Sequence, residues 1–147
     1  MSIWFKGSGD IECSIEQVTQ ASENLGELFV GVVSLMPGLT SVELVEEGKD
    51  FVTIKTNEGL MKRTGISRRM EGQTVTIEFN EEYKAGSMVT ARSHLLDEFT
   101  ASGTHVEHRT EISDVKAPGF LGFFYRLFGS SSIGKAILKS YKAYLEK

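Results

Sequence analysis

The sequence has 147 residues, the size of one domain with a sizeable hydrophobic core, and we expect a single domain over residues 1–147. Its net charge of -4 argues against a nucleic-acid-binding protein, because phosphate contacts require a basic surface. Hydrophobic residues make up 40% of the chain, which is typical of a folded globule and not of a disordered protein.

Targeting signals and the cysteine content indicate the cellular compartment in which we expect the protein. No apolar run is long enough to span a bilayer. The first residues lack the basic region followed by an apolar region that marks a signal peptide. We therefore expect a cytoplasmic protein. Cys13 is the single cysteine, so the sequence excludes an internal disulfide and a multi-cysteine zinc site within one chain.

The N-terminal part predicts one strand and two short helices. The segment Ile3–Cys13 alternates as a strand does. A helix over Ile15–Glu23 follows Ser14, which together with Gln17 has the spacing of a capping box. A second helix, Glu27–Met36, carries an apolar stripe and ends before a Pro-Gly pair.

From residue 41 onward the hydrophobic period becomes that of strands. Short turns rich in glycine separate six segments, and connections this short join antiparallel neighbours. The six predicted strands cover residues 41–46, 51–56, 60–70, 73–81, 87–99 and 104–115.

The strand at 60–70 is unusual because it is rich in basic residues. Unbroken alternation puts Ile66 and Arg68 on one face and Arg63 and Arg69 on the other. Because runs of charge are usually solvated surface, we interpret the arginines as edge residues paired with nearby glutamates, in preference to a patch for an anionic head group.

The C-terminal segment predicts an amphipathic helix preceded by an aromatic stretch. Over Ile133–Lys147, Ile137 and Tyr141 share an apolar face and the lysines lie opposite. In the aromatic stretch Phe120–Phe128 the apolar side chains fall nearly opposite that face, so one straight helix could not bury both sets against one sheet. We therefore expect a kink or break near Gly129.

This order of elements is combined with three stretches typical of one superfamily: the hairpin Ala101–Val106, the stretch Pro118–Gly122 and the ending Leu138–Glu146. Over essentially its whole length the chain resembles the START-like superfamily of polyketide cyclases and dehydrases (SRPBCC). The resemblance implies an α+β helix-grip fold. In that fold a curved antiparallel sheet of about seven strands wraps around a long C-terminal helix and leaves an internal cavity.

The resemblance also implies a class of ligand, because members of this family hold lipids, polyketides, sterols, hormones or isoprenoid quinones under the C-terminal helix. Our first hypothesis is that the chain binds or carries a hydrophobic small molecule and needs no cofactor. The expected walls are Ile66, Ile77, Phe79, Val106, Phe124, Ile137 and Tyr141, and a polar end would be oriented by Arg92, His94, His108 or Tyr125.

Two alternatives remain open on the same fold. The first is a cyclase- or dehydratase-type enzyme in which His94, His108 or Tyr125 acts as acid or base. The second is a docking module whose aromatic segment 120–128 makes transient contact with a membrane or a protein partner. The sequence leaves the oligomeric state open.

A metal site is not expected. His105 and His108 are three residues apart on one predicted strand, and this spacing points their side chains to opposite faces of the sheet. His94 lies on another strand and Cys13 is distant in sequence.

Overall fold

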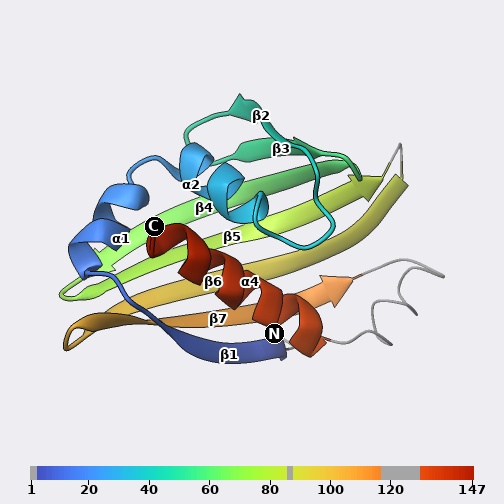
Figure 1. The fold of residues 1–147 in the computed structure, drawn as a ribbon. Coiled ribbons are helices and arrows are strands. Elements are labelled where there is room, and N and C mark those ends of the chain that lie inside the picture. The colour runs from blue at the N-terminus through green and yellow to red at the C-terminus, as the bar shows by residue number, and fades with distance from the viewer. Residues whose placement is uncertain (1–2, 86–87, 117–129) are drawn as a thin grey trace.

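The computed structural model describes residues 3–85, 88–116 and 130–147. A seven-stranded sheet curves around the C-terminal helix, with two short helices over one end of the same face (Figure 1). The strands are β1 (Ile3–Ile11), β2 (Val42–Glu47), β3 (Val52–Thr56), β4 (Leu60–Glu71), β5 (Thr74–Ala85), β6 (Met88–Ser102) and β7 (His105–Lys116). The helices are α1 (Ile15–Ala21), α2 (Leu25–Val33) and α4 (Ser130–Leu145).

The sheet is antiparallel throughout and has the order β1-β7-β6-β5-β4-β3-β2. Strands β2 to β7 follow one another as a meander, and β1 pairs with β7 at the far edge. This arrangement confirms the α+β helix-grip fold that the sequence predicts. Each predicted strand and helix is present in the described residues, with ends that differ by a few residues.

The entry into α1 follows the predicted capping chemistry. The Ser14 hydroxyl accepts a hydrogen bond from the backbone N–H of Gln17, and the Gln17 side chain accepts one from the backbone N–H of Ser14. This capping box satisfies two backbone donors that the first helical turn leaves free. It also fixes the turn between β1 and α1.

Helix α4 lies on the concave face of the sheet with the orientation that its periodicity predicts. Tyr141 and Leu145 are buried against the core, whereas Lys135 and Lys139 are exposed. The last turn is anchored at Glu146, whose carboxylate accepts a hydrogen bond at 2.8 Å from the backbone N–H of Glu12. That bond, together with the nearby Lys142 ammonium, lowers the pKa of the Glu146 carboxyl.

The predicted break near Gly129 and the aromatic stretch Phe120–Phe128 lie outside the described residues. Ser130 and the two serines after it belong to α4. No helix in the described ranges combines the length and the apolar character needed to cross a membrane.

A bulge in β4 overturns the unbroken alternation expected there. Gly65 has a φ of 58°, and the pairing with β5 shifts register between Thr64 and Ser67. Because an inserted residue reverses which face later side chains take, Arg63 joins Ile66 on the concave face. The predicted pairing of Arg63 with a glutamate is confirmed at Glu81, and the prediction that Arg63 is a solvated edge residue is wrong.

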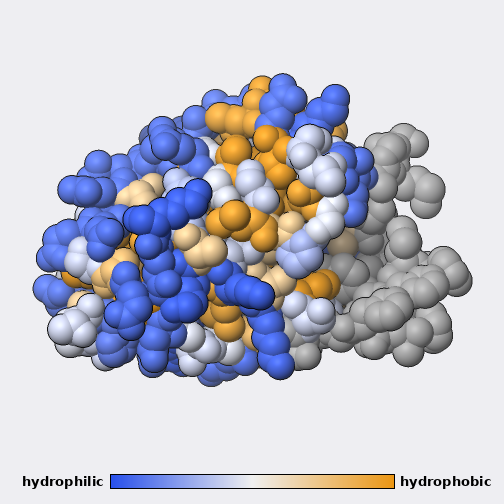
Figure 2. Space-filling view, viewed as in Figure 1, coloured by the Kyte–Doolittle hydropathy of each residue, from blue (hydrophilic) through white to orange (hydrophobic). Residues whose placement is uncertain are grey.

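The surface on the α4 side is divided by polarity (Figure 2). Hydrophobic surface gathers over and beside α2, and hydrophilic surface dominates around α1. At the β2 edge of the sheet, Leu44 and Val45 are exposed beside Glu43, Glu46 and Glu47. This edge therefore carries apolar and acidic side chains together.

The close approach of α2 and α4 depends on a residue without a side chain. A Cβ atom at Gly31 would overlap the ring of Tyr144. We expect Gly31→Ala to lower the free energy of unfolding by about 1–3 kcal/mol through overpacking, although alanine favours helices. Gly9→Ala is the control, since a Cβ at Gly9 meets nothing within 4 Å. Urea unfolding of both variants measures the effect, and equal stability of the two would contradict this packing.

Candidate functional site

The concave face of the sheet beneath α4 is the candidate site. On β5, β6 and β7 every second side chain points to this face, as the pleat requires. On β5 these side chains include the apolar Ile77 and Phe79 and, two residues further on, Glu81. On β6 and β7 the same buried face also carries Asp97, His108 and Thr110. An apolar floor therefore has polar groups set into it.

The carboxylate of Asp97 is held by two side chains of β7. Its Oδ1 accepts a hydrogen bond from Nε2 of His108 at 2.7 Å and a second from the hydroxyl of Thr110. Asp97 and His108 are each 1% exposed. An ionised carboxylate only accepts, so pairing with it requires the His108 tautomer that carries a proton on Nε2.

Helix α4 adds Tyr141 to this group. Its ring meets the His108 imidazole edge-on, with centroids 4.8 Å apart, and Phe99 stacks on the same imidazole at 4.4 Å. Burial raises the pKa of Tyr141 well above its ordinary value, and the negative charge of Asp97 raises it further. The phenol therefore stays protonated and neutral.

Three polar atoms in this group are unsatisfied. Oδ2 of Asp97, Nδ1 of His108 and the hydroxyl oxygen of Tyr141 are buried, and none has a hydrogen-bond partner within the part of the chain that the structure describes. Buried polar atoms are almost always paired, because an unpaired one costs about 1–3 kcal/mol. Three together mark the place where a further polar group belongs.

A buried ion pair extends this group across the sheet. Arg63 on β4 contacts Glu81 on β5 at 3.1 Å, and its guanidinium lies 4.5 Å from the ring centroids of both Phe29 and Phe79. The charges of Arg63 and Glu81 both act on the pKa of Tyr141, which places the pair in the same neighbourhood. We use the name polar strip for Arg63, Glu81, Asp97, His108, Thr110 and Tyr141.

The structure brings together most of the described residues that sequence analysis selected as walls. Ile77, Phe79, Val106 and Tyr141 are buried on the concave side with His108. Two further wall residues, Ile66 and Ile137, are half-buried and pack against this core. Phe124 and Tyr125 lie outside the described residues, and their predicted roles stay predictions.

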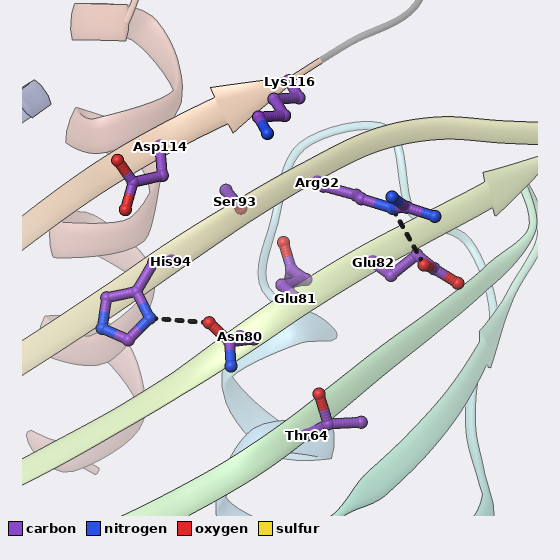
Figure 3. Close-up of a pocket in the computed structure, with 9 residues that line it drawn as sticks. All are labelled: Thr64, Asn80, Glu81, Glu82, Arg92, Ser93, His94, Asp114 and Lys116. Atoms are coloured by element: carbon purple, nitrogen blue, oxygen red, sulfur yellow. Dashed lines mark hydrogen bonds and ion pairs between the residues drawn. The ribbon is translucent and has the colours of Figure 1, made fainter. Parts of the chain in front are cut away.

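Arg92 and His94 do not join this set. They project from the outer face, where they line an open pocket of about 300 Å³ (Figure 3). Arg92 pairs with Glu82 at 3.1 Å. The two ring nitrogens of His94 bond to Asn80 at 2.8 Å and to Glu78. Since His94 alternates with the buried Leu95, the sheet itself separates it from the polar strip, so it cannot orient the same ligand.

The outer pocket is a solvated network of paired charges. The hydrogen bond from His94 lowers the pKa of Glu78, with a smaller contribution from Arg69. Each of these partners is partly exposed, and exposed ion pairs of this kind stabilise proteins only weakly. The concave face is therefore the stronger candidate site.

No cluster of three or more potential metal ligands occurs among the residues that the structure describes. The register puts His108 on the concave face, while His105 lies three residues away on the other face and contacts Asp10 at 3.4 Å. The two histidines therefore do not share a site.

Asp97, Arg63 and Glu81 are not among the site residues predicted from the sequence, although an ion pair between an arginine of this strand and a nearby glutamate is. A signal for Asp97 was present, because it alternates with the apolar Leu95 and Phe99 and must share their face. Arg63 gave no such signal, since its face depends on the bulge at Gly65.

Comparison with known proteins gives structural matches alone. No protein-family model and no curated protein sequence matches the chain. Among solved structures, a hypothetical protein of Helicobacter pylori matches with a TM-score of 0.66 and 10% identity over 97% of this chain and 86% of that chain. A STAR-related lipid transfer protein fragment from Xanthomonas axonopodis matches with a TM-score of 0.56 and 11% identity over 97% and 85%.

A third match has a different activity in its name. It is the Zhui aromatase/cyclase of Streptomyces sp. R1128, with a TM-score of 0.50 and 13% identity over 97% of this chain and 92% of that chain. The chain shares its helix-grip fold with these proteins. This agrees with the resemblance seen in the sequence, and a fold shared at such low identity does not specify a ligand or a reaction.

Two arginines of β4 provide a matched test of the buried ion pair. Arg63–Glu81 and Arg69–Glu78 both join β4 to β5 at 3.1 Å, but the Arg63 side chain is 9% exposed and that of Arg69 is 48% exposed. We expect Arg63→Met to lower the free energy of unfolding by about 3 kcal/mol or more, since it leaves Glu81 unpaired. Arg69→Met should lower it by about 1 kcal/mol or less.

Urea unfolding measures both effects. The double variant Arg63→Met/Glu81→Leu should recover part of the loss, because no charge is then left without its partner. Equal losses in the two single variants would show that burial of the Arg63 pair carries no energetic weight.

The buried phenol predicts a loss of stability in alkali. Below about pH 10 the Tyr141 phenol is protonated in both the folded and the unfolded chain and contributes no pH dependence. Above that pH the unfolded chain releases the proton while the folded chain, with its raised pKa, retains it, so stability falls as pH rises. Tyr141→Phe should reduce this slope by up to about 1.4 kcal/mol per pH unit. Parallel stability curves for the two proteins between neutral and alkaline pH would contradict it.

Proposed function

We propose that the chain binds or carries a hydrophobic small molecule, such as a lipid, a polyketide or an isoprenoid-like compound, between the curved sheet and α4. The observation that carries this proposal is the polar strip, with its unsatisfied atoms surrounded by apolar side chains such as Phe79, Phe99 and Val106. Binding sites for small molecules are mostly apolar and contain a few polar groups that fix orientation.

Burial of apolar surface would supply the affinity. Removing apolar surface from water contributes roughly 25 cal/mol per Å², and the concave face offers aliphatic and aromatic side chains from β5, β6, β7 and α4. The half-buried residues Ile137, Val115 and Tyr83 pack at the margin of the core. A ligand lying against them would gain contact area without disturbing the buried floor.

The structural neighbours support the same class of ligand by analogy. The Xanthomonas axonopodis protein is described as a lipid transfer protein, and this chain shares its fold at a TM-score of 0.56. With 11% identity the likeness is one of fold, and it does not give the identity of the ligand.

An enzyme of the cyclase or dehydratase type is the second candidate, and one observation favours it. His108 is hydrogen-bonded to the carboxylate of Asp97, an arrangement that orients an imidazole for acid–base chemistry. Of the three residues selected from sequence as acid or base, His94 faces outward and Tyr125 lies outside the described residues. The aromatic docking surface at 120–128 also lies outside them and stays a prediction.

Native mass spectrometry of the purified protein tests the proposal. We expect a near-stoichiometric apolar molecule to accompany the protein and to be released on denaturation. Incubation of that molecule with fresh protein separates the two candidates, since a carrier returns it unchanged and a dehydratase returns it with one water fewer. A ligand-free mass together with no uptake of a neutral hydrophobic dye would overturn the proposed function.

A bulky substitution on the inner face of α4 should abolish binding. Ile137 is half-buried and turned toward the core, whereas Lys139 is exposed on the opposite face of the helix. We expect Ile137→Trp to reduce the amount of bound molecule at least fivefold by crowding the contact between helix and sheet, and Lys139→Trp to leave it unchanged. Circular dichroism and thermal unfolding show whether both variants fold. Retention of the molecule by a folded Ile137→Trp protein would place its site elsewhere.

A further inference from the structure

The three unsatisfied atoms of the polar strip have unequal hydrogen-bonding capacity. Oδ2 of Asp97 only accepts. In the His108 tautomer that donates from Nε2 to Asp97, Nδ1 is a second acceptor. The Tyr141 hydroxyl can donate or accept. The site therefore offers two hydrogen-bond acceptors and one hydroxyl that can donate or accept. A ligand that satisfies it must supply a hydrogen-bond donor.

The charges of the strip restrict the partner further. Arg63 and Glu81 neutralise each other at 3.1 Å. An ionised Asp97 then adds one negative charge. Its hydrogen bonds from His108 and Thr110 both end on Oδ1, so Oδ2 has no hydrogen-bond partner among the described residues. An anionic group brought against Oδ2 would be repelled in a site that excludes water, where electrostatic interactions are strong.

From this donor deficit we infer the chemical class of the ligand: an apolar molecule whose polar end is an uncharged hydroxyl, alcoholic or phenolic, that donates to Oδ2 of Asp97 and pairs with the hydroxyl of Tyr141. This inference rests on the proposed function and specifies it. A hydroxyl is itself both donor and acceptor, so it satisfies Asp97 and accepts from Tyr141 in one contact.

The inference excludes two otherwise similar classes of apolar molecule. A fatty carboxylate has no donor and carries a negative charge toward Asp97. An ester has no charge but also no donor, so it can accept from Tyr141 and leaves Oδ2 of Asp97 unsatisfied. Discrimination by a missing donor is strong because it leaves a buried carboxylate oxygen unpaired.

A head-group series with one constant chain measures this selectivity. Dodecanol, methyl dodecanoate and dodecanoate compete at neutral pH with the uncharged dye Nile red for the full-length protein. We expect dodecanol to bind roughly tenfold or more tightly than either of the others, as a hydrogen bond to a charged group implies. Binding of Nile red itself reports the apolar site and so tests the proposed function separately.

Two variants link the selectivity to named atoms. Asp97→Asn keeps the shape but presents an amide N–H₂ in place of Oδ2, which turns an acceptor into a donor, so the preference for the alcohol over the ester should disappear or reverse. Tyr141→Phe should weaken the alcohol roughly fivefold, the value of one neutral hydrogen bond. If Asp97→Asn fails to fold, Tyr141→Phe still provides the test.

The possible outcomes distinguish the inferred hydroxyl head group from the proposed binding of a hydrophobic molecule. Nile red binding with the alcohol preferred, together with loss of that preference in Asp97→Asn or weaker binding of the alcohol in Tyr141→Phe, supports the inference. Nile red binding with the three head groups equal, or with dodecanoate preferred, overturns the inference and leaves the proposed function standing. No binding of Nile red or of any member of the series overturns the proposed function itself.

Discussion

The buried carboxylate of Asp97 is the constraint on which the interior depends. A charge removed from water must be paired and hydrogen-bonded, and Asp97 obtains both bonds from the neighbouring strand through His108 and Thr110. Phe99 stacks on the imidazole and Tyr141 closes over its edge. The registration of β6 with β7 and the position of α4 are thus tied to one carboxylate oxygen.

The same constraint couples stability to binding. Tyr141 belongs to α4 and packs against groups of the sheet floor, so whatever satisfies its hydroxyl also acts on the contact between helix and sheet. A ligand that pairs with Asp97 and Tyr141 would stabilise the folded chain by mass action, because it binds the folded state alone. Occupancy of the site and docking of the helix are in this sense one equilibrium.

Periodicity predicted the elements of this fold because each one buries a face with its own regular spacing. The amphipathic pattern of α4 correctly predicted that Tyr141 is buried and Lys139 exposed. The alternation of side chains along a strand predicted the wrong face where a bulge interrupts the regular backbone. The bulge at Gly65 moved Arg63 into the interior, and a single sequence does not specify where such a bulge occurs. For His94, strand parity alone could not decide which face of the sheet is concave.

The glutamates of β2 bear on how copies of this chain meet one another. As the edge strand of the described sheet, β2 has one row of backbone groups that pairs with no other described strand, and such rows are templates for intermolecular pairing. Leu44 and Val45 would favour that pairing, whereas Glu43, Glu46 and Glu47 would oppose it by bringing like charges face to face. Acidification neutralises carboxylates and removes the opposition. This edge lies on the opposite side of the sheet from β1, so its charge acts on contacts between copies of the chain and not on the interior.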